Sequence, residues 1–123
     1  MSDGVQHIST EDEYHALVAS AEAEDRVICI KVHASFCRAC KAFAPRFTRL
    51  TNDPEFEHVE FYDILIDENK RLVEQLGLTA LPAVEIVAGG RGKGQPLLVG
   101  KSKVSGLVDA LRDTDSRPGV PSL

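Results

Sequence analysis

The chain has 123 residues, of which 43% are hydrophobic and 27% are charged, and its formal net charge is -5. These values are typical of one soluble globular domain, and they exclude a coiled coil, a collagen-like chain and a fully disordered chain. The negative charge argues against a general nucleic-acid binder. The strongly apolar stretches, such as residues 27–30, are far too short to cross a bilayer, so we expect no membrane partner.

The amino-terminal third of the chain predicts two strands and a helix. Residues 5–8 are typical of a short edge strand. Thr10 and the three acidic residues after it form a capping-box signature, which predicts a helix over residues 10–22. Residues 27–32 are β-branched and nearly continuous, as in a buried central strand. Lys31 interrupts this run and requires an explanation.

The middle of the chain changes to a helical period and back again. From Phe36 onward, apolar residues recur at helical spacing, and Pro45 is expected to kink that helix. Residues 58–66 alternate as a strand. Residues 68–76 predict a short helix, and Gly77 is placed to cap its carboxyl end.

The carboxy-terminal part predicts a hairpin and a last helix. A strand over residues 83–87 is followed by a glycine-rich turn at residues 89–94 and a hairpin partner at residues 95–99. Ser102 can cap a helix whose apolar residues lie on one face. Residues 113–123 are polar with two prolines, which predicts a flexible C-terminal tail.

The predicted order of elements is β-α-β-α-β-α-β-β-α. Strands that alternate with helices predict a parallel part of a sheet, and the final hairpin adds an antiparallel part. The expected fold class is therefore α/β, with a mixed central sheet flanked by helices. Residues 1–112 are expected to form a single domain, because the sequence shows neither an internal repeat nor a second domain.

The start of the chain and its cysteines indicate where the protein works. The first residues carry neither a basic start nor an apolar run, so we expect no signal peptide. Two of the three cysteines, Cys37 and Cys40, are spaced as C-x-x-C, and Cys29 stands apart. A secreted disulfide scaffold would carry more cysteines, in pairs. The pattern predicts an intracellular protein that uses its thiols.

Cys37 and Cys40 lie directly after a predicted central strand and at the start of a helix. The unpaired backbone N–H groups of a helix N-terminus stabilise an anion, and Arg38 adds a cation beside them. Both effects lower the pKa of the Cys37 thiol. Cys40 lies one turn further along, within reach for a disulfide. The pair is suited to thiol–disulfide exchange, in which Cys37 attacks and Cys40 resolves the mixed disulfide.

Four segments of the chain resemble the thioredoxin family. Residues 34–45 (ASFCRACKAFAP) resemble its active-site segment, and residues 66–69 (IDEN) resemble the end of its third strand. Residues 79–82 (TALP) resemble its cis-proline loop, and residues 99–100 (VG) resemble the glycine beside its substrate groove. The resemblance covers nearly the whole predicted domain.

This resemblance implies a thioredoxin fold and a protein-disulfide oxidoreductase. The enzyme would exchange dithiol and disulfide with client proteins through Cys37 and Cys40, without a bound cofactor or metal. Its partners would be clients with disulfides and an upstream reductase or dithiol donor, and we expect a monomer. The Leu81–Pro82 peptide would be cis and beside Cys37. The implied substrate-binding residues are Phe36, Leu81, Pro82 and Gly100.

Three positions depart from the family pattern. The usual Trp-Cys-Gly-Pro-Cys is FCRAC here, which is similar to the atypical thioredoxins of plants and algae and leaves the reduction potential open. We therefore expect the cytoplasm or the plastid stroma, with any transit peptide absent from this chain. A buried aspartate six residues before the first cysteine is replaced by Lys31. An aromatic residue four before it is replaced by His33, which either packs in its place or gives acid/base help.

Lys31 and Asp63 are predicted to form a charge-swapped pair. In many thioredoxins the buried aspartate faces a lysine on the neighbouring strand, and that position is Asp63 here. A carboxylate would offset the cost of burying Lys31, so the two charges should lie within about 4 Å of each other beneath Cys40. Asp63, or a neutral Lys31, would take the Cys40 proton during resolution. Alternatively, Lys31 reaches solvent and Asp63 is merely exposed.

Other interpretations of the cysteines remain open. A structural zinc site needs four ligands, and the sequence has no second C-x-x-C. The metal-binding alternative is therefore a metal or iron–sulfur cluster carrier that uses Cys37 from two chains. A third hypothesis is a regulatory oxidant that passes disulfides to clients. Cys29 is expected to be a small buried hydrophobe.

The helix after the cysteines carries a basic stripe. No acidic residue occurs between His33 and Asn52. This stripe is either a solvated helix face or a surface that steers the protein towards acidic patches on its partners. Its members are Arg38, Lys41, Arg46 and Arg49.

Overall fold

The computed structural model describes residues 4–78, 80–88, 92–93, 97–98 and 104–114. Its strands are β1 (Val5–Ile8), β2 (Val27–His33), β3 (Val59–Leu65), β4 (Ala83–Ala88), β5 (Gly92–Lys93) and β6 (Leu97–Leu98). Its α-helices are α1 (Glu11–Ala23), α2 (Arg38–Thr51), α3 (Lys70–Leu76) and α4 (Val104–Arg112). Two short 3-10 helices are η1 (Pro54–Phe56) and η2 (Ile66–Glu68).

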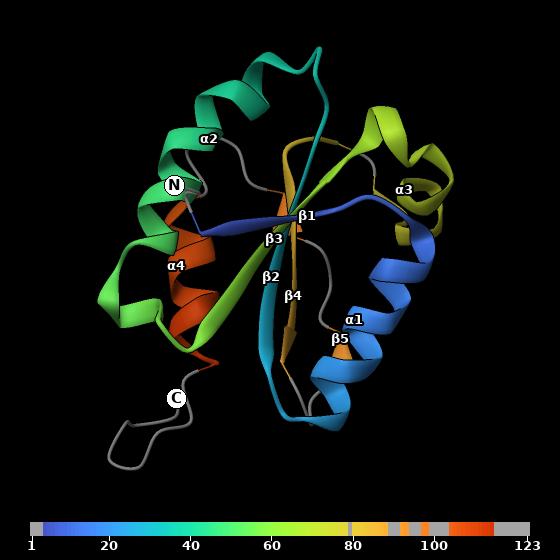
Figure 1. Cartoon of the computed structure of the whole chain (residues 1–123). Coiled ribbons are helices and arrows are strands. Elements are labelled where there is room, and N and C mark those ends of the chain that lie inside the picture. Colours follow the sequence, from blue (N-terminus) through green and yellow to red (C-terminus); the bar gives the residue numbers. More distant parts are fainter. Residues whose placement is uncertain (1–3, 79, 89–91, 94–96, 99–103, 115–123) are drawn as a thin grey trace.

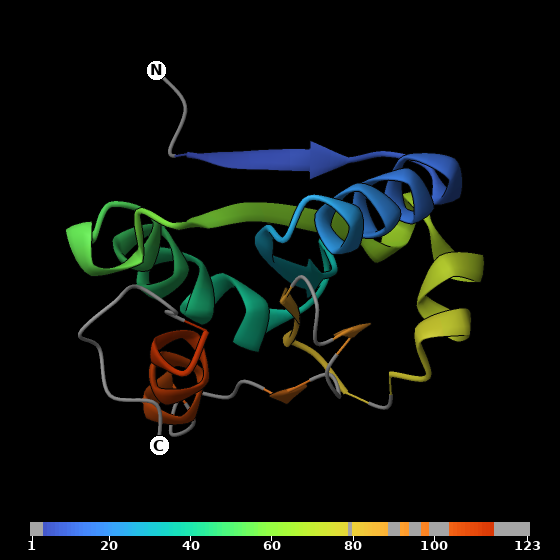
Figure 2. The same ribbon diagram turned by 90° about the horizontal axis from the view of Figure 1, so that it is seen from below.

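The strands form one mixed sheet in the order β1-β3-β2-β4-β5, with β6 also paired to β4. β2 is parallel to β3 and β3 is parallel to β1, whereas β4 is antiparallel to β2 and to both short strands. α1 and α3 cover one face of the sheet, and α2 and α4 cover the other (Figure 1 and Figure 2). The predicted mixed sheet flanked by helices is confirmed.

Each face of the sheet has its own apolar core. Side chains alternate along β2, so Ile28, Ile30 and Val32 belong to the core under α1 and α3, while Cys29 belongs to the core under α2 and α4. In the second core, the Phe47 ring of α2 packs edge-on against Phe61 of β3, with ring centroids 5.5 Å apart. This contact fixes α2, and therefore the cysteines at its start, against the sheet.

Local signals in the sequence determine where the helices begin and end. The Thr10 hydroxyl accepts a hydrogen bond from the Glu13 N–H at 3.1 Å, so the predicted cap of α1 is present. Gly77 ends α3 in the left-handed conformation, with φ of 69°. Both caps agree with the sequence prediction.

Two boundaries differ from the prediction. α3 begins at Lys70 rather than at residue 68, because residues 66–68 form η2 and Asn69 has a non-helical backbone (φ -142°, ψ 49°). In the predicted glycine turn, residues 92–93 form β5 and pair with the end of β4. Of the predicted hairpin partner, residues 97–98 form β6 and pair with the start of β4. Ser102, Gly100 and residues 115–123 of the predicted tail lie outside the described residues.

Candidate active site

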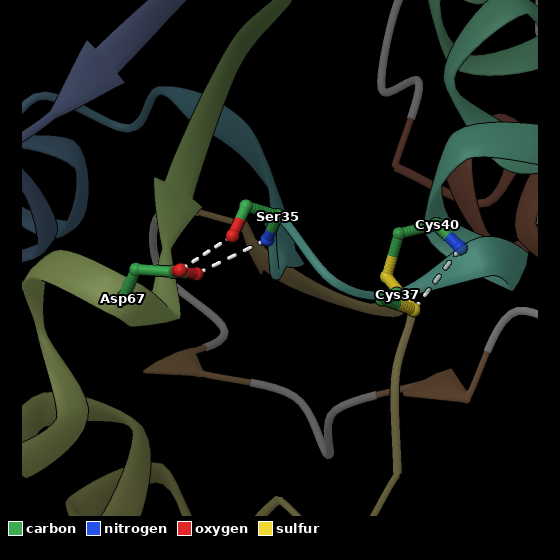
Figure 3. The surroundings of a disulfide bond; sticks show 4 residues. All are labelled: Ser35, Cys37, Cys40 and Asp67. Atoms are coloured by element: carbon green, nitrogen blue, oxygen red, sulfur yellow. Dashed lines mark hydrogen bonds between the residues drawn. A yellow bond between two sulfur atoms is a disulfide. The ribbon is translucent and has the colours of Figure 1, made fainter.

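The cysteine pair lies where β2 passes into α2. A tight turn follows the strand, in which the Cys37 N–H donates to the Ala34 carbonyl at 3.2 Å. Cys37 is the N-cap of α2, and its Sγ accepts a hydrogen bond from the Cys40 N–H at 3.1 Å (Figure 3). The two cysteines are joined as a disulfide, with their Cα atoms 5.2 Å apart. The predicted redox pair is therefore assembled.

The electrostatic surroundings of the two sulfurs differ. The N–H that meets Cys37 Sγ in the disulfide can stabilise a thiolate there after reduction, and the helix dipole acts in the same direction. The first turn of α2 carries no acidic residue to oppose this effect. Cys40 is only 3% exposed, whereas Cys37 is partly exposed. An incoming sulfur therefore reaches Cys37 more readily than Cys40.

The third cysteine takes no part in this site. Cys29 lies in β2 and is fully buried in the core under α2. Burial raises the pKa of its thiol, so that the thiol stays protonated and unreactive at neutral pH. This placement agrees with the expected role as a small buried hydrophobe.

Comparison with known proteins matches this arrangement to one family. The family model for thioredoxins matches residues 5–113. The chain belongs to the thioredoxin family. It is 30% identical to a thioredoxin of Malassezia sympodialis over 63% of this chain and 70% of that protein. It is 36% identical to thioredoxin Asp f 29 of Aspergillus fumigatus over 45% of this chain and 50% of that protein.

Solved structures give the same fold. The crystal structure of the Malassezia sympodialis thioredoxin superposes with a TM-score of 0.73 at 27% identity, covering 88% of this chain and 90% of that one. Thioredoxin f from spinach chloroplast, in its short form, superposes with a TM-score of 0.76 at 22% identity, covering 91% and 94%. With its family, fold and cysteine pair established, the chain is a thiol–disulfide oxidoreductase.

An exposed aromatic residue and a hollow lie beside the redox pair. Phe36, which immediately precedes Cys37, is 78% exposed, although large apolar side chains are usually covered. It forms one wall of a hollow of about 650 Å³. The other lining residues come from η2, α3 and the loop after it: Ile66, Asp67, Lys70, Val73, Glu74 and Leu78.

A carboxylate that the sequence analysis left without a role holds the turn before Cys37. Asp67 accepts hydrogen bonds from the Ser35 N–H at 3.0 Å and from the Ser35 hydroxyl at 2.5 Å (Figure 3). These hydrogen bonds hold the pKa of Asp67 below its usual range. η2 is thereby tied to the segment that carries Phe36 and Cys37. The sequence signal was the resemblance of residues 66–69 to the family, which named no contact.

The structure describes residues 80–82 of the expected proline loop, which include Leu81 and Pro82. The Leu81–Pro82 peptide is cis, as the resemblance implied. Pro82 is buried and Leu81 is partly buried against the core under α1 and α3. Gly100, the fourth expected substrate-binding residue, lies outside the described residues.

Lys31 and Asp63 are neighbours, but the expected ion pair is not among the contacts of Asp63. The parallel register of β2 and β3 sets the two residues opposite each other, so they share the face under α2. Lys31 is 8% exposed, and its Nζ lies 5.1 Å from the centre of the Phe47 ring, a cation–π distance. In the described part of the chain, the ion pairs of Asp63 are with histidines instead.

Asp63 belongs to a cluster of four titratable residues, His7, Asp63, Glu68 and His33, which we call the His7 cluster. His7 Nδ1 is 2.6 Å from Asp63 Oδ1, and His7 Nε2 is 2.7 Å from Glu68 Oε1. His33 Nε2 is buried and lies 3.6 Å from Asp63 Oδ2, beyond hydrogen-bond distance. The cluster was not predictable from sequence patterns, because β1 and β3 are distant in the chain and become neighbours only in the sheet.

The His7 cluster is held together by charge. Hydrogen bonds to Asp63 and then to Glu68 raise the pKa of His7. Burial alone would raise the pKa of Asp63, but His33 and His7 outweigh burial, and the net effect lowers that pKa. Both ring nitrogens of His7 face carboxylates, and only the protonated ring can donate a hydrogen bond to each, so this arrangement favours the imidazolium form.

The described residues also bear on metal binding and on membrane insertion. Within the residues that the structure describes, no group of three or more His, Cys, Asp or Glu side chains has an arrangement that could hold a metal ion. No helix in that same part of the chain has the length and apolar character needed to cross a bilayer.

Proposed function

We propose that the protein reduces disulfides in client proteins through Cys37 and Cys40. The Cys37 thiolate attacks one client sulfur, so that a Cys37–client disulfide forms, the client disulfide breaks, and the released client sulfur takes a proton. Cys40 then gives up its proton and attacks Cys37, which forms the Cys37–Cys40 disulfide and releases the second client thiol. Two electrons and two protons pass to the client, and an upstream reductase or dithiol donor returns them.

One observation carries this proposal. Cys37 Sγ is the N-cap acceptor of the Cys40 N–H and is partly exposed, while Cys40 is buried behind it. This asymmetry supports Cys37 as the nucleophile and Cys40 as the resolving residue. The exposed ring of Phe36 and the hollow beside it support an apolar contact with the client at the moment of attack. The cis Leu81–Pro82 peptide is expected to present backbone to an extended client segment.

Trapping with a variant tests the assignment. Cys40→Ser should leave the Cys37–client disulfide unresolved, so that clients remain covalently attached and are released by dithiothreitol. Cys37→Ser is the matched control and should trap none. Alkylation of the reduced protein at pH 7 should label Cys37 before the other thiols. Preferential labelling of Cys40, or trapping by Cys37→Ser, would reverse the two roles.

Lys31 and Asp63 are proposed to serve the proton transfer from Cys40. Their shared position on the face under α2, in the two strands next to the active-site turn, supports this role. The His7 cluster adds His33, which lies four residues before Cys37, to the same face. Asp63→Asn should slow the second, resolving step and shift its pH profile. Glu68→Gln alters the same cluster at an exposed position and should leave that profile unchanged.

The protein is also proposed to work in a reducing compartment, the cytoplasm or the plastid stroma. The free Cys29 thiol and the single redox pair are compatible with that setting.

A measured reduction potential of the Cys37–Cys40 pair separates a reductase from a regulatory oxidant, because electrons flow from the pair of lower potential to the pair of higher potential. A value near about -270 mV supports the reductase, and a value near about -120 mV supports the oxidant. Absorbance of freshly purified protein tests the cluster-carrier alternative, because an iron–sulfur cluster is coloured and a dithiol is not.

A further inference from the structure

The outer face of α2 carries positive charge beside the nucleophile. α2 and the turn before it contain four cations and no acidic residue, in a chain whose net charge is -5. Arg38, Lys41 and Arg49 are exposed. With 100° per residue they fall within about 80° of arc, and from the first to the last they extend about 16 Å. We call these three residues the α2 stripe.

Three arginines elsewhere in the described residues differ from the α2 stripe, because each is held by a carboxylate of this chain. Arg26, Arg71 and Arg112 each form an ion pair with a glutamate, at 2.7, 3.4 and 2.5 Å. Among the ion pairs and hydrogen bonds of the described residues, none is made by an α2 stripe side chain. In a chain of net charge -5, three exposed cations on the helix that begins beside Cys37 are thus available for an external partner.

From this arrangement we propose that the α2 stripe binds an acidic segment of the client, next to the client cysteine that Cys37 attacks. The proposal rests on the proposed function and names the class of client. The stripe begins at Arg38, adjacent to Cys37, and leads away from it along the helix. A span of about 16 Å matches about five residues of extended chain. A client with several Asp or Glu residues within that distance of its disulfide fits both the charge and the length.

The remaining surface makes this recognition local. A chain of net charge -5 repels an acidic peptide over most of its surface, so binding requires the positive face. At physiological salt the Debye length is about 8 Å, which confines the attraction to the neighbourhood of the stripe. Each exposed ion pair is weak by itself, so three of them together give an effect of about tenfold on binding.

A redox-inert binding experiment tests the stripe without depending on disulfide exchange. The probes are six-residue peptides of glutamate, glutamine or lysine, without cysteine and with an uncharged dye, and the readout is fluorescence anisotropy of the oxidised protein. The glutamate peptide should bind about tenfold more tightly than the glutamine peptide at low salt. The difference should shrink in 0.5 M NaCl, where screening is stronger.

Charge reversal supplies the matched control. Lys41→Glu/Arg49→Glu should abolish the preference for the glutamate peptide. Arg71→Glu/Arg112→Glu makes the same change in net charge on α3 and α4 and should retain it. Lys41→Gln/Arg49→Gln should give an intermediate preference, and circular dichroism checks that all variants are folded. The proposal is overturned if the wild type binds the glutamate and glutamine peptides equally, or if both double-glutamate variants lose the preference alike.

Rates of disulfide reduction separate this proposal from the proposed function. Two disulfide-containing peptides are compared, one flanked by glutamates and one by glutamines. Reduction of the glutamine-flanked peptide by the wild type supports the redox function, and Lys41→Glu/Arg49→Glu should reduce it at the wild-type rate. The same variant should lose about tenfold in kcat/KM on the glutamate-flanked peptide. If neither peptide is reduced, the redox function fails, whereas the binding experiment still decides the fate of the stripe.

Discussion

Replacing Asp63 with asparagine should destabilise the protein within a defined range of pH. The substitution preserves the size of the side chain but removes the charge that meets His7 at 2.6 Å and lies 3.6 Å from His33. Hydrogen bonds to charged groups contribute about 1.5–3 kcal/mol when they are shielded from water. Because the His7 side chain is 42% exposed, solvent screening reduces the expected loss to about 1–2 kcal/mol.

The pH range follows from the two pKa shifts. The hydrogen bond to Asp63, and to a lesser extent the one to Glu68, raises the pKa of His7 in the folded protein. Protonated His7 therefore stabilises the fold fully below its unfolded-state pKa of about 6.5, and this stabilisation is lost as pH rises through its folded-state pKa. Burial opposes ionisation of Asp63, but the neighbouring histidines outweigh burial and lower the pKa of Asp63 in the folded protein. Ionised Asp63 therefore stabilises the fold above about pH 4, and this stabilisation is lost as pH falls through the folded-state pKa of Asp63.

Urea denaturation of the oxidised proteins between pH 3 and pH 9 measures this effect. The difference between wild type and Asp63→Asn should be largest between about pH 4 and pH 6.5 and should decline above that range. Glu68→Gln is the matched control: it removes the other carboxylate of His7 from a more exposed position, so it should show the same pH range with a smaller loss. A difference that stays constant from pH 4 to pH 9, or grows above pH 7, would refute this account of the His7 cluster.

Three further predictions concern the rest of the molecule. Gly77→Ala should lower stability by about 1 kcal/mol in urea denaturation, because its φ of 69° is costly for a residue with a Cβ even though nothing lies within 4 Å of the added atom; an unchanged midpoint would contradict this. Cys29→Ala should leave the rate of disulfide reduction unchanged and lower the unfolding free energy by about 1–2 kcal/mol, because only packing is lost; a slower enzyme would reveal a redox role. Phe36→Ala should raise KM for protein disulfides severalfold at an unchanged melting temperature, since the ring is exposed; equal kinetics would exclude the ring from client binding.

The local part of this protein was visible in the amino-acid sequence. Periodicity, the Thr10 cap and Gly77 placed the main helices and strands, because these signals act between residues close together in the chain. The position of Cys37 at a helix start was predicted from the same local pattern. The resemblance of short motifs to the thioredoxin family then implied the cis peptide before Pro82, which the structure contains.

Short elements and boundaries were harder to predict from sequence. α3 begins at Lys70 rather than at the predicted residue 68, because residues 66–68 form η2. The two-residue strands β5 and β6 are defined by their pairing with opposite ends of β4. Two residues are too few to show the alternation of apolar and polar side chains from which a strand is predicted.

The partners of buried charges were decided by the tertiary structure alone. The resemblance to the thioredoxin family correctly implied that Lys31 lies opposite Asp63, because β2 and β3 keep the register that the family pattern requires. Which atoms they meet depended on elements far away in the chain: the Phe47 ring from α2 lies against Lys31, and His7 from β1 reaches Asp63. A charged side chain near the protein interior needs neighbours that compensate for the hydration it loses on folding. Only the packed fold determines which neighbours are within reach.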